Sequence, residues 1–180
     1  KMGFAGTLDP LATGLMIIGT DGSPRLFPMI EHFKKTYITT IRLDGTTDSY
    51  DLEQPITHID VSVETQTKIS KAFIEQIIRE NFIGKIAQMP PNYSAIWIDG
   101  QRAYDLARKG QEMSIASKER EIDEFEIIEY SWPTIIARIV VSHGTYIRSL
   151  ARDLGEILGT GGYLEKLERT AIGHISLTDV

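Results

Sequence analysis

The spacing of apolar residues along the chain predicts a mixture of strands and helices. Stretches rich in β-branched and aromatic residues predict strands at residues 37–43, 94–98, 122–130 and 134–142. Turns are predicted at Asp44-Gly45, at Asp99-Gly100 and near Trp132-Pro133. Because the strands and helices mix without a regular βαβ rhythm, we predict the α+β class, with a mixed, largely antiparallel central sheet flanked by helices and loops.

Three segments have helical spacing instead. The clearest is residues 147–158, which Gly159 would end and whose apolar stripe comprises Ile147, Leu150, Ala151, Leu154, Ile157 and Leu158. A second helix is predicted over residues 68–81, with Thr67 as its cap and with Ile69, Phe73 and Ile77 on one face. A short third helix is predicted over residues 102–109, ending at Gly110.

Composition restricts the class of protein. With 180 residues, 42% of them apolar, the chain has the size of one domain, expected to span residues 1–180. The absence of cysteine excludes disulfides and thiolate metal sites, and no apolar run is long enough to cross a bilayer. No signal peptide is visible. These features predict a cytoplasmic protein that makes no contact with a membrane, and nothing in them demands more than a monomer.

The charge of the chain does not decide whether nucleic acid is a partner. The net charge of −6 argues weakly against nucleic acid as a partner. The acidity is uneven, however, because residues 119–129 contain six acids and one base, Arg120. Outside that run the balance is closer to neutral, so the composition is compatible with a local basic groove.

The first candidate for chemistry is Asp9, within the segment Gly-Phe-Ala-Gly-Thr-Leu-Asp-Pro-Leu-Ala-Thr-Gly at residues 3–14. Gly6 and Gly14 permit backbone conformations that a Cβ forbids, and Pro10 restricts Asp9 to extended geometry. A carboxylate on such a stiff turn suits chemistry. An ordinary Asp-Pro turn among glycines has the same pattern, so this segment alone leaves both interpretations open.

The second candidate is Arg148, in the first turn of the predicted helix over residues 147–158. It falls off the apolar stripe, so it is expected to face solvent or a cleft. A cation at a helix N-terminus opposes the macrodipole unless it has a partner, and a carboxylate such as Asp9 would provide one. A solvated surface arginine is the alternative, just as ordinary core positions are the alternative for Tyr37 and Tyr146.

Four motifs taken together are more specific than any of these residues alone. They are Gly-x-x-Gly-x-Leu-Asp-Pro-x-Ala-x-Gly around Asp9, Lys-x-Tyr ending at Tyr37, Pro-x-x-Tyr-Ser-Ala at residues 90–95, and Gly-Thr-Tyr-Ile-Arg at residues 144–148. In this order and spacing the chain resembles the TruB family of tRNA pseudouridine-55 synthases, from residue 1 to about residue 173. The resemblance implies the pseudouridine synthase fold, an isomerase that acts on the T-stem-loop of tRNA, and neither a cofactor nor a metal ion.

The resemblance also implies a role for each matching residue. Asp9 corresponds to the essential catalytic aspartate, Arg148 to the arginine that pairs with it and favours its charged form, and Tyr37 to the tyrosine that packs against the target base. The remaining residues that the resemblance places in or near the base pocket are Asp51, Tyr146 and Leu167.

Contacts with RNA follow from the same resemblance. The target uridine must be flipped out of a folded loop before a buried carboxylate can reach it. The family often has His where this chain has Phe4, so we expect base flipping to be retained with different local hydrogen bonding. Residues 91–117 correspond to a mobile loop that closes over RNA.

Cations of this loop and of the N-terminal region are expected to meet phosphates. Those of the loop are Arg102, Arg108 and Lys109, and those that would extend the contact are Arg25, Lys34 and Lys35. For each of them a solubilising surface charge is the alternative.

The chain departs from the family at both ends. The family's Lys-Pro-x-Gly strand has no counterpart before Lys1, and no C-terminal RNA-binding module follows Val180. The sequence is therefore expected to be an N-terminally incomplete catalytic domain.

Two other functions stay open beside the isomerase. A nucleoside hydrolase or glycosidase could use Asp9 as its nucleophile, although such enzymes typically use two carboxylates and the motif partner of Asp9 is an arginine. A protein that binds or folds RNA without reacting with it could retain the same fold.

Overall fold

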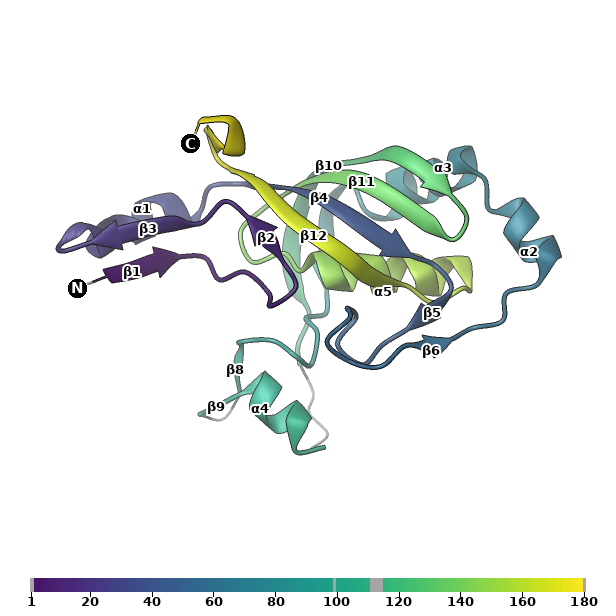
Figure 1. Ribbon diagram of the computed structural model, residues 1–180, viewed down its shortest axis with the longest axis horizontal. Helices are drawn as coiled ribbons and strands as arrows, with labels where there is room; N and C mark the ends of the chain where they lie inside the picture. Colours follow the sequence, from purple (N-terminus) through teal and green to yellow (C-terminus); the bar gives the residue numbers. More distant parts are fainter. Residues whose placement is uncertain (1, 99, 111–114, 180) are drawn as a thin grey trace.

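The structure is a computed structural model that describes residues 2–98, 100–110 and 115–179. Its centre is a seven-stranded sheet (Figure 1). In spatial order, six of its strands are β13 (Ile175–Ser176), β12 (Tyr163–Ile172), β4 (Lys35–Arg42), β11 (Thr134–Val141), β10 (Lys118–Ser131) and β7 (Gly84–Gln88). These six pair antiparallel, whereas β2 (Thr13–Gly14) pairs in parallel with β12. The predicted mixed, largely antiparallel sheet is confirmed.

Two amphipathic helices cover one face of this sheet. Alternate residues of β11, such as Ile135 and Ile139, are fully buried, as a half-buried strand requires. They form one apolar core with buried residues of α3 (Lys71–Asn81) and α5 (Ile147–Leu158). The bounds of α5 agree with the prediction, and Gly159 ends it in the left-handed conformation at φ 71°. Ile157 was expected on the buried stripe, but it is 47% exposed because it lies at the solvent edge of the helix.

The predicted helix over residues 68–81 is two helices. The first, α2 (Val63–Lys68), ends at Ile69, whose ψ of 81° breaks the helix, and α3 then begins after Ser70. The hydroxyl of Ser70, not that of Thr67, caps α3 by accepting a bond from Phe73 N–H. This interruption places the fully buried positions of α3 at Ile74 and Ile78 and leaves Phe73 41% exposed. The predicted face was therefore wrong at Phe73, whereas Ile69 is buried and Ile77 packs against the core.

A small lobe lies below the sheet in Figure 1. It contains β8 (Trp97–Ile98), β9 (Gln101–Arg102) and α4 (Ala103–Arg108), which confirms the predicted short helix. The predicted strand over residues 94–98 is confined to β8. The carbonyls of Ser94 and Ile96 accept bonds from the first residues of α4 instead of from a neighbouring strand. Of the predicted turn at Asp99-Gly100, Asp99 lies outside the described residues.

The N-terminal residues form a hairpin of β1 (Met2–Ala5) and β3 (Ile17–Thr20), which projects beside the sheet (Figure 1). It packs against η1 (Ser23–Leu26) and α1 (Phe27–Glu31). The remaining short elements are β5 (Gly45–Thr46), β6 (Thr57–His58) and η2 (Leu177–Asp179). Within the described residues, no helix has the length and apolar character needed to cross a membrane.

Candidate active site

A cavity of about 510 Å³ opens where the segment after β1, the N-terminal end of α5 and the α4 lobe meet the sheet. It brings together residues that are far apart in the sequence. Each of the four motifs contributes to its lining, with side chains that include Asp9, Tyr37, Tyr93, Tyr146 and Arg148, and Leu167 of β12 lines it too. The tertiary structure thus unites the candidates, with Asp51 directly behind them.

Arg148 links two carboxylates at this cavity. Its Nη2 donates to Asp9 Oδ1 over 2.9 Å, and its Nη1 lies 3.5 Å from Asp51 Oδ2. The side chain of Asp9 remains 31% exposed, whereas those of Arg148 and Asp51 are 3% and 0% exposed. Of the two carboxylates, only Asp9 is open to a ligand.

Residues 49–53 form a hydrogen-bonded support for this arginine. Ser49 Oγ donates to Asp51 Oδ1 over 2.5 Å, the Glu53 N–H donates to the same oxygen, and the Ser49 carbonyl accepts a bond of 3.1 Å from Arg148 Nη1. Arg148 therefore faces a cleft and is buried at its base. The alternative of a solvated surface arginine was wrong, because a partner on each side makes burial of the charge tolerable.

Two effects compete for the charge of Asp9. Burial is the larger and raises the pKa of Asp9 above its ordinary value, while the charge and hydrogen bond of Arg148 lower it and the charge of Asp51 raises it. Arg148 thus favours the ionised carboxylate, as expected, but does not fully compensate for burial. The result is a carboxylate that holds a proton more readily than an exposed aspartate.

Two tyrosines flank the carboxylate. Tyr37 is on β4, and Tyr146 is the residue immediately before α5. Burial raises the pKa of both phenols above the ordinary value, so both are neutral at physiological pH. Both residues line the cavity, and an aromatic ring with a hydroxyl suits contact with a planar heterocycle.

Gln88 is a site residue that the sequence analysis did not identify. Its side-chain amide is 1% exposed and pairs twice with the backbone of Tyr146: Oε1 accepts from the Tyr146 N–H over 2.8 Å, and Nε2 donates to the carbonyl over 3.1 Å. The next residue, Met89, accepts a bond from Ser149 Oγ. The end of β7 therefore holds the first turn of α5, from which Arg148 projects. Gln88 lies two residues before the Pro-x-x-Tyr-Ser-Ala motif, and this position was the signal in the sequence that could have identified it.

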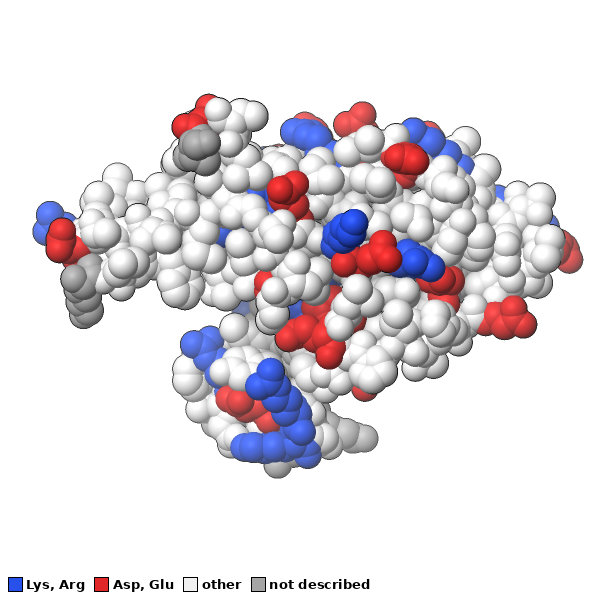
Figure 2. All heavy atoms as spheres, in the orientation of Figure 1, with Lys and Arg blue, Asp and Glu red and all other residues white. Residues whose placement is uncertain are grey.

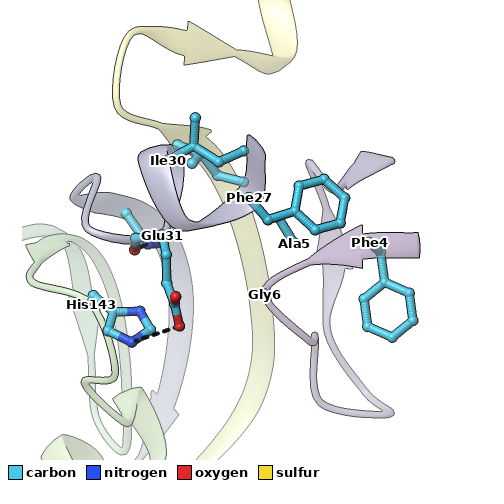
Figure 3. A pocket seen from close by; sticks show the side chains of 9 residues that line it. Phe4, Ala5, Gly6, Phe27, Ile30, Glu31 and His143 are labelled. Carbon is cyan, nitrogen blue, oxygen red and sulfur yellow. Dashed lines mark hydrogen bonds and ion pairs between the residues drawn. The ribbon is translucent and has the colours of Figure 1, made fainter. Parts of the chain in front are cut away.

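Phe4 does not line the cavity that contains Asp9. Its ring is 56% exposed and borders a separate cavity of about 180 Å³ together with Phe27, Ile30 and His143. In Figure 3 the Phe4 ring projects from β1 away from the His143–Glu31 pair, whose side chains lie 3.4 Å apart. The two cavities share Gly6, Lys35 and His143, so Phe4 is at the border of the candidate site and not within it.

The cations named for phosphate contact fall into two groups. Blue side chains gather on the α4 lobe in Figure 2, where Arg108 lines the Asp9 cavity, Lys109 is exposed and Arg102 stacks over Trp97 at 4.5 Å. Arg25 is exposed on η1.

Two N-terminal cations are engaged within the protein. Lys35 is 8% exposed and donates to the carbonyls of Glu31 and Phe33, and Lys34 pairs with Asp123 of β10. The ammonium group of Lys35 is therefore used inside the protein, which argues against its contact with phosphate. Lys34 is 49% exposed in a surface ion pair, so its phosphate contact stays a prediction.

No group of three or more His, Asp or Glu side chains in the described ranges is arranged to hold a metal ion.

Comparison with known proteins agrees with this geometry. The chain matches the TruB family pseudouridylate synthase (N terminal domain) over residues 1–147. It is 46% identical over 179 residues to the tRNA pseudouridine synthase B of Phocaeicola vulgatus, covering 99% of this chain and 74% of the relative. It is 38% identical to the enzyme of the same name from Mycobacterium ulcerans, covering 99% of this chain and 59% of that one.

Solved structures with the same fold come from larger proteins. A Cbf5-Nop10-Gar1 complex matches with a TM-score of 0.68 and 25% identity over 99% of this chain and 44% of its own. An H/ACA RNP bound to a substrate RNA containing 2'-deoxyuridine matches with a TM-score of 0.67 and 22% identity, over 98% of this chain and 40% of its own. The pseudouridine synthase fold is thus confirmed, and the family match over most of the sequence means that this chain belongs to the TruB family of pseudouridylate synthases.

Proposed function

We propose that this protein converts uridine to pseudouridine at position 55 in the T-loop of tRNA, with Asp9 as the essential carboxylate. The observation that carries the proposal is the pairing of a partly exposed Asp9 with a buried Arg148 at the base of a cavity lined by Tyr37, Tyr146 and Leu167. The relatives named tRNA pseudouridine synthase B support tRNA as the substrate.

In the proposed reaction the bond between ribose C1′ and uracil N1 breaks, the base rotates, and a bond between C1′ and C5 forms. The proton on C5 is lost and N1 gains one, so atoms and charge balance without an external reagent. Asp9 either attacks C1′ or removes a sugar proton on a glycal route, and both require its ionised form. Arg148 supplies the charge that favours this form.

Tyr37 is assigned to the base. Its ring packs against the uracil, and its hydroxyl moves the C5 proton, directly or through water, after the new bond has formed. A neutral phenol is the appropriate starting state, and the direction of the Tyr37 pKa supports this assignment.

Delivery of the uridine requires base flipping, whose cost of a few kcal/mol is partly offset by stacking on protein groups. We assign the stacking outside the cavity to Phe4, which is exposed at its border. The α4 lobe, within residues 91–117, closes over the RNA and meets its phosphates through Arg102, Arg108 and Lys109. The protein acts as a monomer in the cytoplasm and without a cofactor.

One feature argues against a glycosidase. Hydrolysis by two carboxylates needs both at the sugar, but Asp51 has 0% exposure and lies behind Arg148. Asp51 is therefore excluded as the second carboxylate, and the other acid that lines the cavity, Glu53, is exposed to solvent.

The test uses T-arm RNA with tritium at uridine C5, incubated with the wild type and with Asp9→Asn. Isomerisation releases tritium while the mass of the RNA otherwise stays the same, and the variant binds but releases none. Free uracil with an abasic site would indicate a hydrolase. Binding without either product would indicate a non-catalytic RNA-binding protein. Tritium release undiminished in Asp9→Asn would refute the assignment of Asp9.

A further inference from the structure

Arg169 is a buried cation of the Asp9 cavity for which no role has been assigned above. It lies on β12, is 2% exposed, and lines the same cavity as Asp9 and Tyr37. Among the residues that the structure describes, no carboxylate lies within ion-pair distance of its guanidinium. A buried cation is costly unless its N–H groups are hydrogen-bonded, and Arg169 directs two of them to the loop that carries Asp9.

The guanidinium connects the two ends of this loop. Its Nη2 donates to the Gly6 carbonyl over 3.0 Å, and its Nε donates to the Leu15 carbonyl over 2.8 Å. Asp9 lies between these two anchors in the sequence. The planar fork of donors in arginine is suited to spanning two acceptors, whereas a lysine ammonium is a compact point charge.

The backbone of Arg169 strengthens the same contact. Its carbonyl accepts a bond of 2.7 Å from the Leu15 N–H, and its residue position pairs with Gly14 in the parallel β2–β12 bridge. A Cβ built on Gly14, whose φ is 102°, would lie only 2.3 Å from the Arg169 carbonyl oxygen. Both the backbone and the side chain of Arg169 therefore hold the loop that carries Asp9 in place.

Tyr37 is the third neighbour. Arg169 and Tyr37 face each other in the register of β12 and β4. The charge and hydrogen bonding of Arg169 lower the pKa of Tyr37, against the larger effect of burial. The Arg169 guanidinium thus bonds to the loop that carries Asp9 and also lowers the pKa of the Tyr37 phenol.

We propose that Arg169 is a positioning residue of this active site, which fixes the Asp9 loop at both ends and places a buried positive charge beside Tyr37, its register partner on β4. The proposal rests on the proposed function, in which Asp9 and Tyr37 are the reacting groups. It assigns to Arg169 an effect on the chemical step and none on the affinity for RNA.

The experiment compares Arg169→Lys and Arg169→Ala with Ile78→Ala, a core substitution in α3 that does not line the cavity. Three quantities are measured: the single-turnover rate of tritium release from T-arm RNA, the Kd for that RNA, and amide hydrogen exchange of residues 7–14. We expect both Arg169 variants to lose about 10- to 100-fold in rate, because small displacements of a reacting group have effects of this size, with Kd within about twofold. Exchange of residues 7–14 should become faster in both.

Chemical rescue adds a signature that a general loss of stability would not give. Millimolar guanidinium should partly restore the rate of Arg169→Ala, whereas the same concentration of urea should not, and Ile78→Ala should respond to neither. If Arg169→Lys retains wild-type rate and exchange, or if Ile78→Ala loses the same rate, the proposal is wrong. A wild type that releases no tritium would refute the proposed function, while the exchange of residues 7–14 would still decide whether Arg169 anchors the loop.

Discussion

Arg148 Nη2 donates to Asp9 Oδ1 over 2.9 Å, and this single ion pair joins the N-terminal loop to the first turn of α5 across 139 positions of sequence. On its other side the same guanidinium contacts the fully buried Asp51. Arg148 therefore has a structural partner and a chemical partner. Its substitution should affect stability and rate in different proportions.

Replacement of Arg148 by Met should destabilise the protein strongly. Asp51 would be left buried without a cation, and breaking a buried ion pair in this way costs about 3–5 kcal/mol. Chemical denaturation of Arg148→Met and of the double variant Arg148→Met/Asp51→Asn measures this cost. The double variant should recover part of the lost free energy of unfolding and remain inactive. Equal stability of the two variants would mean that Asp51 is not the group left unpaired.

The rate should depend on pH through Asp9. Burial raises the pKa of Asp9 above the ordinary 3.8 of an aspartic acid. As the pH is lowered, Asp9 therefore takes up its proton at a higher pH than an exposed aspartate does. We expect the acid limb of the single-turnover rate to lie above pH 3.8, with one proton taken up. An acid limb at or below 3.8, measured in a pH range where circular dichroism shows the fold intact, would contradict the assignment.

The same shift predicts the effect of Asp9→Asn on stability. An acid whose pKa is raised in the folded state binds its proton more tightly there than in the unfolded chain, so stability is lost as pH rises through the folded-state pKa. Asparagine resembles the protonated form. We therefore expect Asp9→Asn to abolish activity while its Tm at pH 7 is no lower than that of the wild type. Near pH 3, where Asp9 is protonated in both states, the difference in Tm should shrink.

Substitution of Gln88 should lower both stability and reaction rate, although Gln88 does not line the cavity. Gln88→Leu removes both bonds to the Tyr146 backbone, and a buried unsatisfied group costs about 1–3 kcal/mol. We expect lower stability and a reduced rate with little change in RNA affinity. Gln76→Leu is the matched control, because Gln76 bonds only with the exposed Glu80 on α3. Similar losses in both variants would indicate a general effect of glutamine substitution.

The positive charges of the α4 lobe should contribute to the affinity for RNA. Arg108→Ala and Lys109→Ala should each weaken RNA binding and lower the slope of log Kd against log salt by about 1, or by about 0.7 if the contacted phosphates are single-stranded. Lys85→Ala on β7 serves as the control, because Lys85 pairs with Glu119 in the acidic part of the sheet. An unchanged salt slope in the α4 variants would assign these cations to the solvated surface.

Local patterns predicted the elements that depend on local physics. The helix over residues 147–158 followed from its own apolar period and from Gly159, and both were confirmed. The helix over residues 68–81 was misjudged because its apolar residues kept helical spacing across Ile69, where the chain bends between two capped helices. The strand over residues 94–98 was overextended because its carbonyls pair with the start of α4, which strand propensity does not reveal.

In the candidate site, too, short motifs predicted some features and the tertiary structure decided others. The four motifs selected Asp9, Tyr37 and Arg148, and the fold brings all three to one cavity. Phe4 had the right position in its motif, but it lies at the border of that cavity, next to a smaller one. Lys35 was named for phosphate contact, but its ammonium group is used inside the protein.

By itself, therefore, the sequence determined the α+β class, the family and the identities of the residues expected to react, because these depend on local periodicity and on short motifs. Only the tertiary structure decided what supports them. Gln88 meets Tyr146 across 58 positions, and Arg169 meets Leu15 across 154. No local pattern encodes such contacts, since they exist only after the sheet has brought β12, β4 and the Asp9 loop together. The charge of Asp9 is likewise set by burial and by Arg148, both of which are properties of the folded chain.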